Sequence, residues 1–307
     1  MDILLNWIGT IPNSIVQGLI WGIMAIGVYI TYKVLDVADL TVDGSIATGA
    51  AVFAVLLSSG VNIWICMICS FVSGMLAGLV TGFLHTFVGI PAILAGILTQ
   101  LMLYSANLTI MGKSIISIPR LKFGDQLIIN LASDKIWITI LVVGAITAGI
   151  IFALYLFFGT EFGSALRATG NNIKMSRAQG INTDFAKVFG LALSNGVVAL
   201  AGSLLAQYNG SADVKMGTGA IVVGLAAVVI GGALSVKLPS NFALRLSFVV
   251  IGAIIYWMVF QLVMSFNIDA DFLKMLSAVV VAIFLGVPHI KGKYFSKKKK
   301  GGVSKNA

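Results

Sequence analysis

Long apolar runs separated by short polar stretches occupy most of this chain. The runs lie at Ile11–Tyr32, Ser45–Leu57, Val61–Leu84, Pro91–Ile110, Ile136–Phe158, Val188–Tyr208, Gly219–Leu234, Leu244–Phe266 and Phe272–Val287. Most approach the roughly 20 residues that a helix needs to cross a bilayer, and the second is short. None shows the period-2 alternation of a barrel strand. The pattern predicts an all-α polytopic membrane protein, a bundle of about 8–10 transmembrane helices.

One long polar segment, Gly159–Lys187, interrupts this pattern. Gly170 predicts a helix end, because glycine adopts the left-handed conformation cheaply. Asn171 then predicts the N-cap of a short helix, Asn172–Gln179, which Gly180 ends in turn. A polar segment with its own helices, held between spans, must lie in water.

The next helix has its own start residues. Asn182 or Thr183 is expected to cap it, with Asp184 near its positive end. The short helix before it bears Lys174 and Arg177 and is expected to lie parallel to the membrane. Two interpretations fit this pattern, an ordinary amphipathic surface helix and a docking element for a partner.

Composition agrees with a membrane protein. The chain is 59% hydrophobic and only 10% charged, with a mean hydropathy of +1.03. Much of the net charge of +9 lies in residues 291–307, which follow a predicted permease domain of residues 1–290. A basic tail after a final apolar helix predicts a cytoplasmic segment that lies against anionic lipid. The charge is therefore not a sign of nucleic-acid binding. The basic residues of Gly159–Lys187 place that segment on the same side, since four spans separate the two. Met111–Lys135 then falls outside, although it is itself basic.

Acidic residues near the second apolar run admit two interpretations. Asp36 is expected to be a solvated loop charge, whereas Asp39 and Asp43 flank Leu40-Thr41-Val42 just before Ser45–Leu57. In one interpretation Asp43 caps the second helix at the cytoplasmic interface. In the other, the short second helix starts inside the membrane and the two acids edge a translocation path.

Uncharged polar residues within the spans also have two interpretations. Gln100, Tyr104 and Asn107 share nearly one helical face, and Asn195 lies in the sixth span. Such residues line a pathway or bond neighbouring helices. The small residues of Val188–Tyr208 and Gly219–Leu234 predict close helix approach at the centre of the bundle.

The sequence contains no pattern typical of a metal site or a nucleotide-binding site. His85 and His289 have no metal-ligand partner at usable spacing, and Cys66 and Cys69 lie in an apolar run. Gly112-Lys113-Ser114 ends like a phosphate-binding loop but lacks the required first glycine. The sequence therefore predicts no metal and no cofactor in this chain, so that ATP and Mg would be bound by a separate subunit.

Several stretches resemble a known family. The run GSALRATGNNIKMSRAQGINTDFAK, Gly163–Lys187, continues as VFGLALSNGVVALAGSLLAQYNG and resembles the corresponding region of branched-chain amino acid and ribose ABC importer permeases. Gly22–Ser45 and Gly89–Thr99 resemble the family's first span and turn and its Ile-Pro-Ala-type span start. The resemblance covers roughly Gly18 to Val287 and is greatest to permeases that accompany tryptophan/tyrosine-type binding proteins. Ser235–Ser240 departs from the family's Gly-rich turn, and Asp43 is an extra acid.

The resemblance implies a bacterial ABC importer subunit in the cell membrane. It implies a second permease copy as a homodimer, cytoplasmic ATPase subunits, an extracytoplasmic substrate-binding (lipo)protein, and a small solute, an amino acid and perhaps an aromatic one. The short helix becomes the coupling helix of segment 159–187, and the expected ATPase contacts are Arg167, Asn171, Asn172, Lys174, Met175, Arg177 and Gly180. The expected pathway residues are Asp39, Asp43, Gln100, Asn107 and Asn195. The alternative is an ion-coupled secondary transporter, which would need buried ionisable pairs at mid-span.

Overall fold

The computed structural model describes residues 2–118, 128–129, 136–235 and 241–265, with six further positions between 275 and 286. Of the predicted last span, Phe272–Val287, only those six positions are described. The basic tail 291–307 and most of the turn Ser235–Ser240 also lie outside them.

The described chain is almost wholly helical. In order, its elements are α1 (Asp2–Tyr29), the π-helical turn η1 (Ile30–Val34), α2 (Val42–Ser58), α3 (Ile63–Thr86), α4 (Ala92–Met111), β1 (Ile115–Ser117), α6 (Ile136–Gly159), α7 (Glu161–Asn171), α8 (Ile173–Ala178), α9 (Thr183–Asn209), β2 (Ser211–Asp213), α10 (Ala220–Ser235) and α11 (Phe242–Met264). Within this part, six helical stretches are long and apolar enough to cross a membrane, and α2 and α10 are shorter apolar helices. The predicted all-α, multi-pass membrane fold is confirmed.

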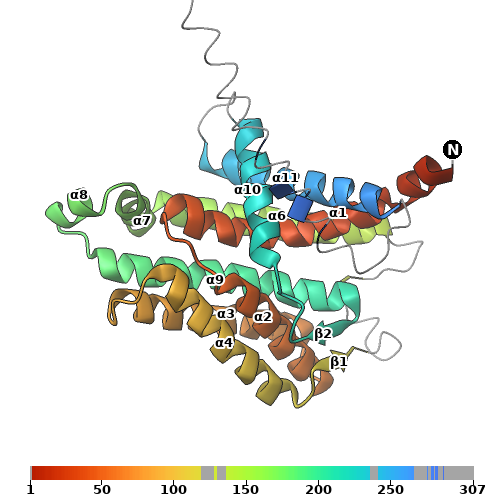
Figure 1. Cartoon of the computed structure of the whole chain (residues 1–307), viewed down its shortest axis with the longest axis horizontal. Helices are drawn as coiled ribbons and strands as arrows, with labels where there is room; N and C mark the ends of the chain where they lie inside the picture. Colours follow the sequence, from red (N-terminus) through yellow and green to blue (C-terminus); the bar gives the residue numbers. More distant parts are fainter. Residues whose placement is uncertain are drawn as a thin grey trace, which may run out of the picture.

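The two ends of the long axis carry different structures. Figure 1 shows α7 and α8 at one end, hereafter the α8 end, and β1 and β2 at the other, the strand end. β1 and β2 pair antiparallel, with Ile116 opposite Ala212. The segments that follow α4 and α9 therefore meet at one end, opposite Gly159–Lys187. Of the segment Met111–Lys135, which the sequence places on the side opposite Gly159–Lys187, residues 119–127 and 130–135 lie outside the described residues, and its sidedness stays a prediction.

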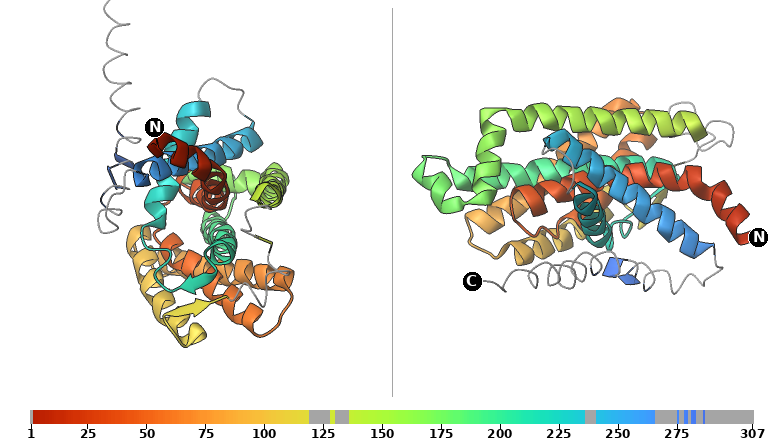
Figure 2. Two further views of the ribbon diagram at one scale, coloured as in Figure 1. Left: turned by 90° about the vertical axis from the view of Figure 1, so that its right-hand side faces the viewer. Right: turned by 90° about the horizontal axis from the view of Figure 1, so that it is seen from above.

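Helix α9 is the central element of the bundle. It lies between α1 on one side and α2 and α3 on the other (Figures 1 and 2). Its small residues allow this close packing: a Cβ atom on Gly202 would overlap the Ile46 carbonyl of α2, and one on Gly74 of α3 would overlap the Asn195 carbonyl of α9. The prediction that Val188–Tyr208 lies at the centre of the bundle is confirmed.

Helix α10 does not run along the long axis. It crosses α1 and α9 steeply in Figure 1, and the view from above in Figure 2 shows it nearly end-on. At 1.5 Å per residue, its 16 residues extend about 24 Å. The predicted seventh span, Gly219–Leu234, is therefore a short transverse helix packed on α1 and α11. Its start is fixed by a contact with α2.

Candidate functional site

The segment between η1 and α2 extends into the interior of the bundle instead of turning at its edge. Asp39 is buried there; its Oδ1 accepts a hydrogen bond from the Thr41 backbone N–H (2.8 Å), and its Oδ2 accepts one from Asn195 Nδ2 (2.7 Å). Asn195 Oδ1 accepts from the Ser45 hydroxyl at 2.6 Å. Because Asn195 lies near the middle of the 27-residue α9, α2 begins about halfway along that helix. This favours the interpretation in which the second helix starts inside the membrane.

Asp43 bonds a different helix from the one that carries it. It lies in the first turn of α2, and its carboxylate accepts hydrogen bonds from the backbone N–H groups of Gly219 (2.8 Å) and Ile221 (2.9 Å). The N-cap residue of α2 is Thr41, which makes no side-chain cap bond. Of the two interpretations, the one in which Asp43 caps the second helix is therefore wrong: Asp43 caps α10. The positive ends of two helices meet at this carboxylate, and both stabilise its charge.

A cavity of about 300 Å³ opens beside Asp43, between α2, α4 and the segment that follows β2. It brings together three of the predicted pathway residues, Asp43, Gln100 and Asn107, with Tyr104 from the same face of α4. Asn107 is fully buried, and neither its Oδ1 nor its Nδ2 has a partner among the described residues. Asp39 and Asn195 belong instead to the packed interior, where they bond each other.

Lys215 and Thr218 also line this cavity, and sequence reasoning missed both. They lie in the segment between β2 and α10, which turns back from the strand end to reach Asp43. In the sequence this segment looks like an ordinary loop between two spans. Lys215 comes to lie beside the polar face of α4 because the end of this segment, at Gly219, is hydrogen-bonded to Asp43 of α2.

The polar interruption forms α7, α8 and the start of α9, and its caps are mostly as predicted. Asn182 caps α9 by accepting a hydrogen bond from the Phe185 N–H at 3.1 Å. Gly180 ends α8 with a φ of 80°, a conformation that favours glycine. Two details were wrong. Asn172, not Asn171, caps α8, through the Met175 N–H, and α7 continues through Gly170 to Asn171.

Gly170 continues the helix because of a tertiary contact. A Cβ atom there would overlap the carbonyl of Val34 at the end of η1. Glycine is thus needed at this position for close packing of α7 on η1 and not for a helix end. The sequence pattern alone does not distinguish these two uses of glycine.

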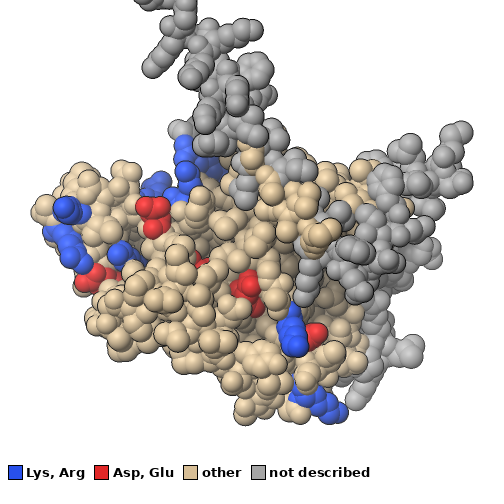
Figure 3. Space-filling model, viewed as in Figure 1, with Lys and Arg blue, Asp and Glu red and all other residues tan. Residues whose placement is uncertain are grey.

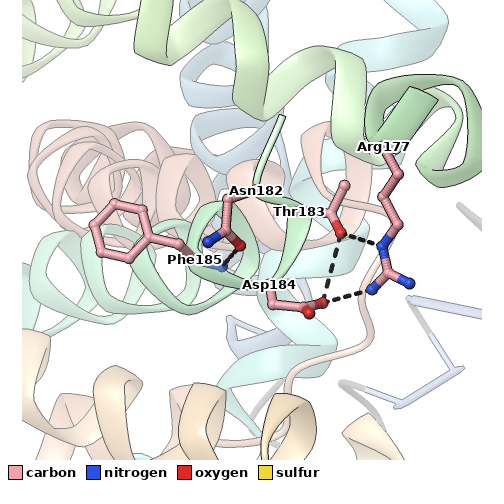
Figure 4. A network of polar contacts seen from close by, with 5 residues as sticks. All are labelled: Arg177, Asn182, Thr183, Asp184 and Phe185. Atoms are coloured by element: carbon pink, nitrogen blue, oxygen red, sulfur yellow. Dashed lines mark hydrogen bonds and ion pairs between the residues drawn. The ribbon is translucent and has the colours of Figure 1, made fainter. Parts of the chain in front are cut away.

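Arg177 is bound within the chain (Figure 4). Its Nε donates to the Thr183 hydroxyl at 2.7 Å, and its Nη2 lies 2.8 Å from Asp184 Oδ1. Both partners belong to the first turn of α9, so Arg177 ties α8 to α9. Arg167 likewise donates to the Phe158 carbonyl at 2.8 Å and ties α7 to the end of α6. These contacts give both arginines a positioning role.

Three further predicted contact residues are exposed: Asn171 at the end of α7, and Lys174 and Met175 in α8. Ile173, the first residue of α8, is exposed as well. Lys174 makes no ion pair among the described residues. The surface formed by Ile173, Lys174 and Met175, hereafter the α8 surface, therefore combines two exposed apolar side chains with an unpaired positive charge.

An aromatic cluster packs α7 and the start of α9, the two elements on either side of α8, onto the rest of the bundle. Its members are Phe157, Phe158, Phe162, Phe185, Phe189 and Phe242. Ring centroids lie 5.0 Å apart for Phe162 and Phe189, and 4.7 Å apart for Phe158 and Phe242. Contacts of this kind join the end of α6, α7, and the first turns of α9 and α11 into one packed unit. Sequence reasoning did not identify this cluster, because its members come from four separate segments.

Comparisons with known proteins agree with this architecture. The family described as the permease component of the branched-chain amino acid transport system matches residues 10–288. A tyrosine transport system permease protein of Clostridioides difficile is 38% identical over 280 residues, which cover 91% of this chain and 92% of that protein. An uncharacterised protein of Rickettsia prowazekii is 33% identical over 89% of this chain and 95% of its own length.

More distant similarities extend the comparison. The autoinducer 2 import system permease protein LsrC of Escherichia coli is 30% identical over 63% of this chain and 55% of its own length. The PsaBC structure from Streptococcus pneumoniae superposes with a TM-score of 0.52, covering 92% of this chain and 95% of that one at 15% identity, which shows likeness of fold alone. The chain is a transport permease and not a catalytic enzyme. With its multi-pass fold and a family match over nearly its whole length, it belongs to the branched-chain amino acid permease family of ABC transport systems.

Proposed function

We propose that this chain is the membrane-spanning subunit of a bacterial importer for an amino acid, with an aromatic amino acid as the first candidate. Two copies form the pathway, and an extracytoplasmic binding protein delivers the solute. Separate ATPase subunits hold ATP and Mg and drive the cycle. The relative from Clostridioides difficile, whose name states tyrosine transport, supports the solute class.

The observation that carries the proposal is the construction of the α8 end. The α8 surface is exposed and unpaired, while Arg167, Arg177 and the aromatic cluster fix the helices behind it to the bundle. A partner that pushes on α8 would therefore move α6, α9 and α11 together. This is the mechanical requirement for coupling ATP hydrolysis in one subunit to rearrangement of another. In this proposal the α8 end and the tail are cytoplasmic.

The pathway contains the cavity beside Asp43. Asp43, Gln100 and Asn107 line it, whereas Asp39 and Asn195 hold the start of α2 against α9. Polar groups on an open face of a membrane bundle are costly unless a partner or an aqueous path covers them. The second permease copy covers this face in the assembled importer.

The first experiment reconstitutes the chain with its partner ATPase and binding protein in liposomes. Uptake of labelled L-tyrosine is expected to require ATP and to stop with an ATPase variant that cannot hydrolyse it. Uptake by the chain alone, driven by a proton or sodium gradient, would instead establish the secondary transporter. Asp39, a buried acid within the bundle, is the residue that such a mechanism would use.

The second experiment tests the docking surface. Lys174→Glu and Met175→Glu are expected to reduce co-purification of the ATPase while the chain still inserts at wild-type level. Lys113→Glu is the matched control, because Lys113 is an exposed lysine near the strand end. An undiminished complex with both α8 variants would contradict docking at this surface.

A further inference from the structure

The cavity beside Asp43 carries charges of opposite sign on two of its walls. Asp43 comes from α2, and Lys215 comes from the segment between β2 and α10. The remaining wall is α4, with Gln100, Tyr104 and Asn107. In Figure 3, acidic and basic side chains lie near each other on the part of this face away from the α8 end, with mostly uncharged residues around them.

Neither charged side chain has an ion-pair partner among the described residues. Among the described residues the single ion pair is Arg177–Asp184, so Asp43 and Lys215 are not within ion-pairing distance of each other. Asp43 accepts two backbone N–H groups, and its two oxygens together have about four lone-pair positions. The backbone N–H of Lys215 donates to the Asp213 carboxylate at 2.8 Å, but the Lys215 ammonium group has no acceptor in the described part of the chain. A ligand that offers one cation and one anion would satisfy both.

Asn107 provides an independent observation of a missing partner. Its amide is fully buried, lines the cavity, and has both polar atoms unpaired among the described residues. Buried polar groups in native structures nearly always have a partner, and an unpaired one suggests an unseen ligand or water. Gln100 lies two helical turns earlier on the same face and offers a second amide.

We propose that this cavity is a transit site for a zwitterionic amino acid, with the α-ammonium group held by Asp43 and the α-carboxylate by Lys215. The inference rests on the proposed function and deepens it by assigning recognition of the solute's two charges to this chain. A sugar would leave both charges unpaired, and a simple anion or cation would leave one. Leu101, Val214 and Ala47 line the same cavity and provide apolar contact for the solute's side chain.

The size and openness of the cavity suit a transient site. Its volume of about 300 Å³ is at the lower end of the range for small-molecule sites. A transport pathway needs binding that is favourable enough for entry and weak enough for release. A site open to one side, completed by few polar groups, meets both conditions.

The test uses the reconstituted importer, the chain with its ATPase and binding protein. The probe is a mixture of the twenty labelled standard L-amino acids, and the measured quantities are the maximal uptake rate at saturating binding protein and the ATPase rate. Lys215→Gln is expected to lower the maximal uptake rate about tenfold, the effect of one lost charge-assisted hydrogen bond. ATPase stimulation by the loaded binding protein is expected to stay at the wild-type level.

Asn107→Leu is the second variant, because it replaces an unpaired buried amide with an apolar side chain of similar volume. It is expected to insert and melt like the wild type while its maximal uptake falls. Lys113→Gln, which removes an exposed lysine outside the cavity, is the control and keeps full uptake.

The outcomes separate the two proposals. Unchanged uptake in Lys215→Gln or in Asn107→Leu, with ATP-dependent uptake by the wild type intact, overturns the transit site and leaves the proposed function standing. A higher binding-protein requirement with an unchanged maximal rate assigns Lys215 to binding-protein docking and also overturns it. Absence of ATP-dependent amino acid uptake by the wild type overturns both.

Discussion

Asn195 donates a hydrogen bond from Nδ2 to Oδ2 of Asp39 across 2.7 Å, although the two residues are 156 positions apart. The bond fixes the segment before α2 to the middle of α9, with both side chains buried. As a result α2 begins inside the bundle, where Asp43 of its first turn can reach the start of α10. Two short helices thus start at interior positions: the Asp39–Asn195 bond holds the start of α2, and Asp43 caps the start of α10.

Removing the buried carboxylate should destabilise the fold. Asp39→Ala leaves the Thr41 N–H and the Asn195 amide without their acceptor, and each unpaired buried group costs about 1–3 kcal/mol. We expect a clearly lower thermal unfolding midpoint for the detergent-solubilised chain. Glu161→Ala, which removes an exposed carboxylate, is the control and should melt close to the wild type. An equal midpoint for Asp39→Ala would show that the network contributes little.

The Asp43 carboxylate should slow hydrogen exchange of the backbone amides at the start of α10. In Asp43→Ala the Gly219 and Ile221 amides lose their acceptor, a change worth about 1 kcal/mol by analogy with other N-caps. Hydrogen exchange of these amides is expected to become about fivefold faster, which corresponds to that free energy. Amides in the middle of α3 serve as the internal reference. Asp43→Asn, which keeps one acceptor oxygen, should give an intermediate rate, and equal protection in all three chains would contradict this role.

Close packing between α9 and α2 should not tolerate an added methyl group. Gly202→Ala places a Cβ atom against the Ile46 carbonyl, and overpacking of this kind costs about 1–3 kcal/mol. The unfolding midpoint should fall. Gly144→Ala in α6 is a matched control, since a Cβ atom there meets nothing within 4 Å. That substitution should instead be neutral or stabilise the helix by about 0.5–1 kcal/mol.

The ion pair of Arg177 and Asp184 should matter more for coupling than for stability. Both side chains are about half exposed, and exposed pairs contribute about 0.2–1 kcal/mol. Arg177→Ala and Asp184→Ala are each expected to melt within a few degrees of the wild type but to lower ATP-dependent uptake by the importer. The swapped chain Arg177→Asp with Asp184→Arg should recover part of that uptake. Equal loss in the swapped chain and the single variants would assign Arg177 a direct contact with the ATPase instead.

The sequence predicted the features that depend on neighbouring residues. Long apolar runs appear as helices, and Asn182 and Gly180 act where expected, because capping and helix ends are decided within a few residues. The same local reasoning failed at Gly170, whose lack of a side chain serves contact with Val34. It also offered only the nearer helix end as a cap for Asp43, since the start of α10 lies 176 residues away in sequence.

The apolar pattern of the sequence was enough to predict a helical membrane bundle, because crossing a bilayer depends on the length and total apolarity of each segment. The tertiary structure decided where the polar groups meet. It turned α10 across the bundle, enclosed Asp39 with Asn195, and brought Asp43, Asn107 and Lys215 around one cavity. These juxtapositions depend on close contacts between helices far apart in the chain, and the apolar pattern of each helix is compatible with many such arrangements.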